Sequence, residues 1–122
     1  SGSVGFDIYN RETAVIKSFE FKKLPANLTI KVPNGHYLMV EPRSSVLFKF
    51  GLLVVGGTID QDYCGENDEI HITVINMTKK SVKLEKGTRI AQGIFSKISK
   101  VDFSEVPKMS AQSRGGFGTT GH

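Results

Sequence analysis

Hydrophobic and polar residues alternate with a period of two along most of this chain. The alternation covers residues 19–21, 28–32, 70–74 and 82–84, and turn formers such as Pro33-Asn34-Gly35 separate the runs. A period of two is typical of β-strands that bury one face. Many short strands joined by frequent turns predict an all-β fold, which would be a sandwich, a jelly roll or a small barrel.

One segment departs from this rhythm and has the spacing of a helix. Two serines, Ser44 and Ser45, precede apolar residues at positions 46, 47, 48 and 50. Serine is a favoured N-cap because its hydroxyl oxygen accepts a hydrogen bond from a free backbone N–H of the first turn. We therefore expect one short helix here, with a serine N-cap.

The last part of the chain loses the apolar pattern. This loss begins at about Val106, and residues 113–121 have the sequence SRGGFGTTG. A glycine-rich chain end is typically mobile until a ligand orders it. With no internal repeat and no second apolar unit, the sequence predicts one β domain over residues 1–111 and a flexible C-terminal arm over residues 112–122.

Composition places the chain among ordinary globular proteins. Of its 122 residues, 39% are hydrophobic and 23% charged, which suits one domain with a single core. No apolar run approaches the roughly 20 residues of a membrane helix, and no signal peptide opens the chain. Because Cys64 is the sole cysteine, no internal disulfide can form. We expect a cytoplasmic or nuclear protein that is not secreted and does not bind membranes.

The charge distribution indicates a small anionic ligand. Sixteen basic residues exceed twelve acidic ones, an excess that fits a polyanionic ligand and equally a generic solvated surface. Three of the four arginines, Arg43, Arg89 and Arg114, lie in segments marked by glycine or serine. The rigid guanidinium fork matches phosphate oxygens well, so this placement favours phosphate recognition. We expect no nucleic acid partner.

Two early segments contain residues that strand formation does not require. Asp7 interrupts an apolar run, where it could approach a metal ion or cap a turn. In the second segment Arg43, Ser44 and Ser45 lead into the expected helix, and a guanidinium, two hydroxyls and free N–H groups form a good phosphate cradle. The alternative is a helix cap beside a surface arginine.

The third segment, residues 56–65, is the most informative. Asp60 and Asp62 alternate with β-type residues, so the pattern predicts that both point the same way. A carboxylate held there could accept a proton from water as a general base, and Tyr63 could offer a flat face to a sugar. The alternative is that both aspartates form a hairpin turn together with Gly65.

Two later segments add polar residues among glycines. Arg89 and Gln92 interrupt a predicted strand and could bind an anion or support a neighbouring loop, with support the favoured role for Arg89. In the final glycine-rich stretch, backbone N–H groups and Arg114 could bind phosphate, and Phe117 could stack on a base.

Taken in order, the five segments resemble the five motifs of the trimeric dUTPase family, and they span residues 5–121. One such motif is unspecific, whereas five in the right order and at workable spacing are highly specific. The resemblance implies a jelly-roll-like β fold and a homotrimer in which three subunits share each active site. It also implies Mg²⁺-dependent hydrolysis of dUTP to dUMP and pyrophosphate by attack of water on the α-phosphorus.

The resemblance further implies roles for individual residues. Asp60 would be the catalytic residue that orients the attacking water, and Asp7 would help to hold the hydrated magnesium ion. Tyr63 would pack on the deoxyribose and exclude a 2′-hydroxyl, while backbone around Gly57 would recognise uracil. The other implied substrate contacts, most of them to phosphates and one from a ring over uracil, fall on Arg43, Ser44, Ser45, Ile59, Gln92, Arg114, Gly116, Phe117, Gly118, Thr119 and Thr120.

Three features depart from the family pattern. The chain starts almost at the first motif, where relatives usually have a short N-terminal strand. Ser45 stands where many members have glycine. The last motif is two residues shorter between Gly115 and Gly116, which alters the expected position of Arg114.

Other functions fit the sequence less well. A sister group on the same fold deaminates dCTP with a glutamate three residues before an asparagine, and here the place before Asn76 is taken by Thr73. A dUTPase-like binding module without activity would not need to retain Asp60, Tyr63, Gln92 and Phe117. An active enzyme could also have a protein partner. A purely structural jelly roll explains none of the five segments.

Overall fold

The computed structural model describes residues 5–118 of the chain. Within them, short strands and one helix follow one another closely. The elements are β1 (Phe6–Tyr9), β2 (Ala14–Ile16), β3 (Phe21–Pro25), β4 (His36–Pro42), α1 (Ser44–Phe50), β5 (Leu52–Val55), β6 (Gly57–Ile59), β7 (His71–Asn76), β8 (Val82–Leu84) and β9 (Arg89–Lys97).

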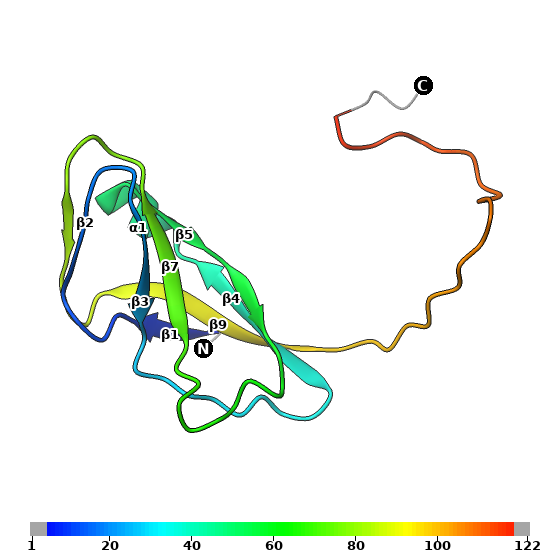
Figure 1. The fold of residues 1–122 in the computed structure, drawn as a ribbon, viewed down its shortest axis with the longest axis horizontal. Helices are drawn as coiled ribbons and strands as arrows, with labels where there is room; N and C mark the ends of the chain where they lie inside the picture. The colour runs from blue at the N-terminus through cyan, green and yellow to red at the C-terminus, as the bar shows by residue number, and fades with distance from the viewer. Residues whose placement is uncertain (1–4, 119–122) are drawn as a thin grey trace.

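The strands form three antiparallel sheets (Figure 1). The largest has the order β1-β9-β4-β6, the second has the order β3-β7-β5, and β2 pairs with β8 alone. Sequence neighbours are rarely sheet neighbours, since β9 lies between β1 and β4. The all-β, jelly-roll-like fold with one short helix is therefore confirmed.

Alternating side chains of the sheets fill one core. In β7, residues Ile72, Val74 and Asn76 are buried while the residues between them are more exposed, as the period of two predicts. Asn76 is the polar member of this inner row. Its side-chain amide donates to the carbonyl oxygens of Ile16 (2.9 Å) and Lys80 (2.8 Å), so the buried polar group is satisfied.

The predicted helix is present, but its start differs from the expectation. Ser44 and Ser45 are its first two residues, while Arg43 occupies the N-cap position and makes no side-chain capping bond. The serine N-cap was therefore wrong. At the other end Gly51 adopts a left-handed conformation (φ 70°) and donates its N–H to the Leu47 carbonyl at 2.8 Å, a common helix stop.

Two strand expectations were also wrong. Residues 28–32 keep their alternating burial, yet no strand forms there. The Leu28 carbonyl accepts a hydrogen bond from the N–H of Ile70 (2.8 Å), just before β7 begins. The segment buries one face, which explains its alternating sequence, but it does not pair with a neighbouring strand. Phe19 lies in the turn before β3, with a positive φ of 58°.

Residues 98–118 follow β9 without further strand or helix and run away from the sheets (Figure 1). Several apolar side chains of this segment are exposed, and Phe103 and Phe117 are fully exposed. At the root of the segment, the N–H of Ile98 donates to the Gly35 carbonyl (2.8 Å). No helix within residues 5–118 is long and apolar enough to span a membrane.

Candidate functional site

The first, second and fourth sequence segments meet around one carboxylate. Asp7 lies in the middle of β1, and its two oxygens face two arginines. Arg43 Nη1 donates to Asp7 Oδ1 at 2.8 Å, and Arg89 Nη1 donates to Oδ2 at 3.4 Å. Asp7 and Arg43 are partly shielded from water, whereas the Arg89 side chain is half exposed.

Gln92 lies beside this cluster because of strand register. Asp7 pairs with Gln92, and Gln92 pairs on its other side with Glu41 of β4. Residues directly opposite one another in a sheet project from the same face. The neighbouring row contains the buried Ile8 and Ala91, so the Asp7 row lies on the outer face. The structure thus places Asp7 and Gln92 together.

The start of α1 extends this polar region. Arg43 precedes the helix, and both Ser44 and Ser45 are exposed at its first turn. Arg43, Ser44 and Ser45, which the sequence assigned to phosphate contacts, therefore lie next to the Asp7 cluster. Glycine is not required at position 45, because the helix accommodates serine there.

The third segment forms a separate region on the opposite edge of the large sheet. Gly57 and Ile59 belong to β6, which pairs with β4. A small cavity of about 150 Å³ opens beside them. It is lined by Val40, Val55, Gly56, Gly57, Thr58, Ile59, His71 and Thr73. Gly57 has no neighbour within 4 Å of where a Cβ would be, so the missing side chain leaves the backbone open to a ligand.

Asp60 and Tyr63 lie directly beyond β6, in a turn. The N–H of Tyr63 donates to the Asp60 carbonyl at 3.2 Å, and Asp60 and Asp62 are both exposed. The two aspartates are therefore turn residues and not strand residues. The Tyr63 hydroxyl donates to the Glu69 carbonyl at 3.0 Å, which fixes the ring beside the turn. Gln61 steadies the same turn through the carbonyl of Pro33 (3.3 Å).

The fifth segment lies apart from both regions within one chain (Figure 1). Arg114, Gly116, Phe117 and Gly118 belong to the extended tail, where Arg114 and Phe117 are exposed. Positive φ angles at Gly115 (89°), Phe117 (50°) and Gly118 (85°) give the tail a tight bend. Thr119 and Thr120 lie outside the described residues.

Register gives the separation between the two regions on the sheet. Ile59, the residue before Asp60, pairs with Leu38 of β4. Gln92 pairs with Glu41, which lies three residues further along β4, and Gln92 itself belongs to β9, two strands away from β6. With about 3.3 Å per residue along a strand and about 4.8 Å between strands, Asp60 and Gln92 are about 16 Å apart. A single chain therefore does not bring the Asp60 turn into contact with the Asp7 cluster.

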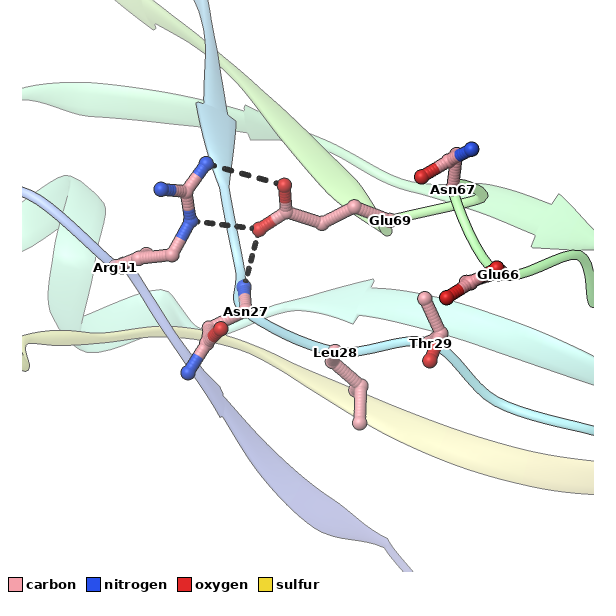
Figure 2. Close-up of a pocket in the computed structure, with 7 residues that line it drawn as sticks. All are labelled: Arg11, Asn27, Leu28, Thr29, Glu66, Asn67 and Glu69. Atoms are coloured by element: carbon pink, nitrogen blue, oxygen red, sulfur yellow. Dashed lines mark hydrogen bonds and ion pairs between the residues drawn. The ribbon is translucent and has the colours of Figure 1, made fainter.

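A further pocket of about 340 Å³ has a different character (Figure 2). Across its wall Arg11 donates to both oxygens of Glu69, at 2.8 and 3.1 Å, and Glu69 also accepts from the N–H of Asn27 (2.7 Å). The hydrogen bond from Arg11 lowers the pKa of the Glu69 carboxyl, and the same contact raises the pKa of Arg11. The Arg11–Glu69 pair thus forms a structural clasp between the loop after β1 and the segment before β7.

Sequence reasoning missed some of these participants. It treated Arg89 mainly as support, whereas its guanidinium faces the same carboxylate as Arg43. The only available signal was its position three residues before Gln92. His71 and Thr73 line the cavity beside Gly57, which nothing in their local pattern indicated. No group of three or more potential metal-ligating side chains occurs in the described part of the chain.

Comparison with known proteins agrees with this geometry. The family model described as dUTPase matches residues 1–121. The deoxyuridine 5'-triphosphate nucleotidohydrolase of Hydrogenobaculum sp. is 38% identical and covers 99% of this chain and 85% of its own. That of Fusobacterium nucleatum is 34% identical over 98% of this chain and 84% of its own.

A solved structure agrees at the level of the fold. The crystal structure of dUTPase from Streptococcus mutans superposes with a TM-score of 0.79 at 30% identity, covering 84% of each chain. The family model, which matches residues 1–121, includes both the Asp7 cluster and the Asp60 turn. This chain belongs to the dUTPase family.

Proposed function

We propose that the chain hydrolyses dUTP to dUMP and pyrophosphate by attack of water on the α-phosphorus, with magnesium as cofactor. The observation that supports this best is the cluster of Asp7, Arg43 and Arg89 beside the first turn of α1. Two guanidiniums next to free hydroxyls suit the charge and shape of a triphosphate. The identity of the nucleotide, dUTP, is inferred from membership in the dUTPase family.

The two regions of the surface would divide the work. Arg43, Ser44, Ser45 and Gln92 would bind phosphates at the α1 end of the large sheet. The cavity beside Gly57 and Ile59 would receive the uracil ring through backbone groups, and Tyr63 would pack on the deoxyribose. The exposed carboxylate of Asp60, at the mouth of this region, would accept a proton from the attacking water.

A magnesium ion fits the residues present only together with substrate. Magnesium is commonly held by one or two carboxylates and by substrate phosphates, and it retains several waters. The Asp7 carboxylate would hold such an ion through water while it keeps its contacts with the two arginines. When bound, the ion would neutralise charge on the phosphates.

A homotrimer would bring the separated regions together. Asp60 lies about 16 Å from Gln92 within one chain, a gap estimated from strand register. The tail from residue 98 onward extends past the body and exposes Val101, Phe103 and Met109. A neighbouring subunit would cover these side chains, and Arg114, Gly116, Phe117, Gly118, Thr119 and Thr120 would then close over a site on that neighbour. Under this proposal residues 1–111 form the domain and residues 112–122 the arm.

A substrate panel tests the proposal. The protein is incubated with each deoxynucleoside triphosphate and with UTP, with and without Mg²⁺, and pyrophosphate is measured. We expect pyrophosphate from dUTP in the presence of Mg²⁺, very little from UTP, and no deamination of dCTP, because Thr73 has no carboxylate. Equal turnover of dUTP and UTP would contradict the role of Tyr63, and release from none of them would contradict the function.

A further inference from the structure

Three segments meet at one end of the molecule, around the last residues of α1. They are the turn between β2 and β3, the turn after β7 and the C-terminal half of α1 (Figure 1). Backbone bonds join them, since Phe19 donates to the Asn76 carbonyl at 2.8 Å and Met77 donates to the Gly51 carbonyl at 3.0 Å. We call eight exposed residues of these segments and of the start of β3 the basic–aromatic end: Lys17, Phe19, Phe21, Lys22, Phe48, Met77, Lys79 and Lys80.

The apolar members of this end are open to solvent. Phe48 is 86% exposed, Phe21 74%, Phe19 61% and Met77 51%. Large apolar side chains that are exposed singly need no explanation, whereas a group of them on neighbouring segments is typical of an interaction surface.

The backbone of Phe19 adds a second, independent signal. Its φ of 58° lies in the left-handed region, where a bulky residue is an outlier and asparagine or glycine is far less strained. The ring is also mostly exposed, so neither the turn nor the core accounts for a phenylalanine at this position. Strained residues of this kind cluster at functional sites.

The charged members of this end are all cationic. Lys17, Lys22, Lys79 and Lys80 are exposed, and among the described residues none of them has a carboxylate within 4.0 Å. The one acidic residue in these two turns is Glu20, whose Oε1 accepts a hydrogen bond from the Lys17 backbone N–H at 2.8 Å. Four positive charges against one negative charge leave an excess of three.

We propose that the basic–aromatic end binds an anionic lipid surface, with its aromatic rings in the headgroup region and its lysines beside the acidic headgroups. Exposed rings flanked by lysines are the combination that binds at membrane interfaces. Rings that protrude from turns enter a deformable lipid layer without a matching groove. The sequence-based expectation of no membrane binding rested on the lack of a spanning segment, and binding at the surface needs none.

The basic–aromatic end is separate from the candidate uracil region, so the inference does not depend on the proposed function. Met77 directly follows β7, whose first residue, His71, lines the cavity beside Gly57. Six residues of extended chain separate them by about 20 Å. Substitutions at this end should therefore leave kcat for dUTP unchanged.

Sedimentation with lipid vesicles tests the inference on the full chain. One set of vesicles contains phosphatidylcholine and phosphatidylserine in equal parts, and a second set contains phosphatidylcholine alone. We expect the parent to sediment with the anionic vesicles only. The bound fraction should fall as the salt concentration rises, because salt screens the lysines.

The double variant Phe19→Asn/Phe48→Gln tests the rings. Loss of one inserted ring corresponds to about tenfold in affinity, so vesicle binding should weaken about tenfold for each ring. Asparagine suits a positive φ and glutamine is a good helix former, so Tm should equal or exceed that of the parent. A purely structural role for the rings predicts a lower Tm instead. Phe19→Leu/Phe48→Leu keeps apolar side chains and should retain most of the binding.

The double variant Lys79→Gln/Lys80→Gln tests the charges. A lysine near an anionic surface corresponds to about fivefold in affinity, so binding should weaken by about that factor for each lysine. Lys31→Gln/Lys97→Gln is the matched control, because it changes the net charge equally at two exposed lysines outside the basic–aromatic end. This control should bind as the parent does.

Several outcomes would overturn the inference. One is a parent that does not sediment with anionic vesicles, and another is equal sedimentation of the parent, the double ring variant and the Lys79→Gln/Lys80→Gln variant. Binding of a deoxythymidine oligonucleotide in place of vesicles would assign the surface to nucleic acid. A smaller assembly of the double ring variant in light scattering would assign it to a second copy of the chain. Vesicle binding by a protein that hydrolyses no dUTP would contradict the proposed function alone.

Discussion

At the scale of single residues, the carboxylates around the site differ in whether a cation or an N–H group pairs with them. Asp7 is compensated by two arginines, and Glu69 by Arg11 and a backbone N–H. Asp60 has no ion pair among the described residues and lies exposed at the end of β6. Under the proposed function, this carboxylate would accept the proton of the attacking water.

Replacement of Asp60 by asparagine tests this assignment. The change keeps the shape of the side chain and removes its basicity, and loss of a general base costs roughly 100- to 10,000-fold in rate. We expect kcat for dUTP to fall within that range while dUTP binding, measured by calorimetry, is retained. Asp62→Asn, in the same turn, serves as the control and should keep most of the activity. A parental rate in Asp60→Asn would refute the role.

The Arg11–Glu69 clasp predicts a pH dependence of stability. Because the pKa of Glu69 is lowered in the folded protein, the ionised carboxylate stabilises the fold above the usual pKa of glutamate. This contribution is lost as the pH falls below about 4.3 and Glu69 takes up a proton. Glu69→Gln should therefore lower Tm at pH 7, and the difference from the parent should shrink towards pH 3. A difference that stays constant across this range would show that the carboxylate's charge does not matter.

At the scale of elements, the local sequence pattern predicted which side chains of a segment are buried. It predicted less well whether the segment pairs with another strand. The alternation in residues 70–74 and the helical spacing after Ser44 were both confirmed. Residues 28–32 show the same alternation but form no strand, because burying one face does not require a partner strand. Burial is a property of the local sequence, whereas a ladder depends on distant segments.

The candidate site illustrates the same limit. The sequence shows the five segments, and their residue types indicate phosphate chemistry, which stays a prediction. The contact of Asp7 with Arg89 could not be predicted, because the two residues are 82 positions apart and meet only through the register of β1 on β9. The basic–aromatic end likewise depends on how the turns before β3 and after β7 pack beside the end of α1.

The C-terminal glycine of α1 gives an element-level test. Gly51 has a φ of 70°, and a Cβ there would clash with the Thr78 Cγ2 methyl group. Gly35 has a similar φ of 75° with open space around it. Strain in the left-handed region costs about 1–3 kcal/mol, so Gly35→Ala should lose about that much unfolding free energy and Gly51→Ala should lose more. Denaturant unfolding measures both.

A second substitution separates strain from collision. Thr78→Ser removes the Cγ2 methyl but keeps the hydroxyl that bonds to Asn76 and to the Lys80 carbonyl. In the Gly51→Ala background it should recover the extra loss and leave the cost of the left-handed φ. No recovery would mean that the loop after β7 already moves aside to admit the methyl group.

The tail is the remaining element with a predicted role. Truncation after Ala111 removes Arg114 and Phe117 but none of the strands. One lost charged hydrogen bond corresponds to about tenfold, so dUTP turnover should fall by at least that factor. The truncated protein should keep the parental circular dichroism spectrum and size-exclusion volume. Unchanged turnover would show that the tail takes no part in the reaction.

At the scale of the whole molecule, the distribution of the site over the surface favours an assembly. The Asp60 turn follows β6 and the Asp7 cluster lies on β1, at opposite edges of the large sheet. The tail runs away from the sheets (Figure 1). In a closed ring with threefold symmetry, each subunit can present a different one of these regions to each neighbour. The catalytic unit proposed for this protein is thus a contact between chains.

Mixing two inactive variants tests this directly. Asp60→Asn chains retain the Asp7 cluster, and Arg43→Gln chains retain the Asp60 turn. If a site takes one region from each of two neighbours, random co-assembly at equal amounts restores about a quarter of the sites, because each of two positions is correctly filled half of the time. Co-refolded mixtures are assayed for dUTP turnover against each variant alone. Activity no higher than the sum of the separate variants would place each site within one chain.

The position of β9 in the large sheet has a consequence for how the protein is made. β1 is formed by residues 6–9, but its hydrogen-bonding partner consists of residues 89–97. Loop closure over such a distance slows folding, and proteins dominated by distant pairings typically fold in milliseconds to seconds. On a ribosome, which emits about 5–20 residues each second, β1 and β4 would wait several seconds for β9 to appear. During that interval their unpaired edges are open to other chains, so chaperone supply should influence the yield of native protein.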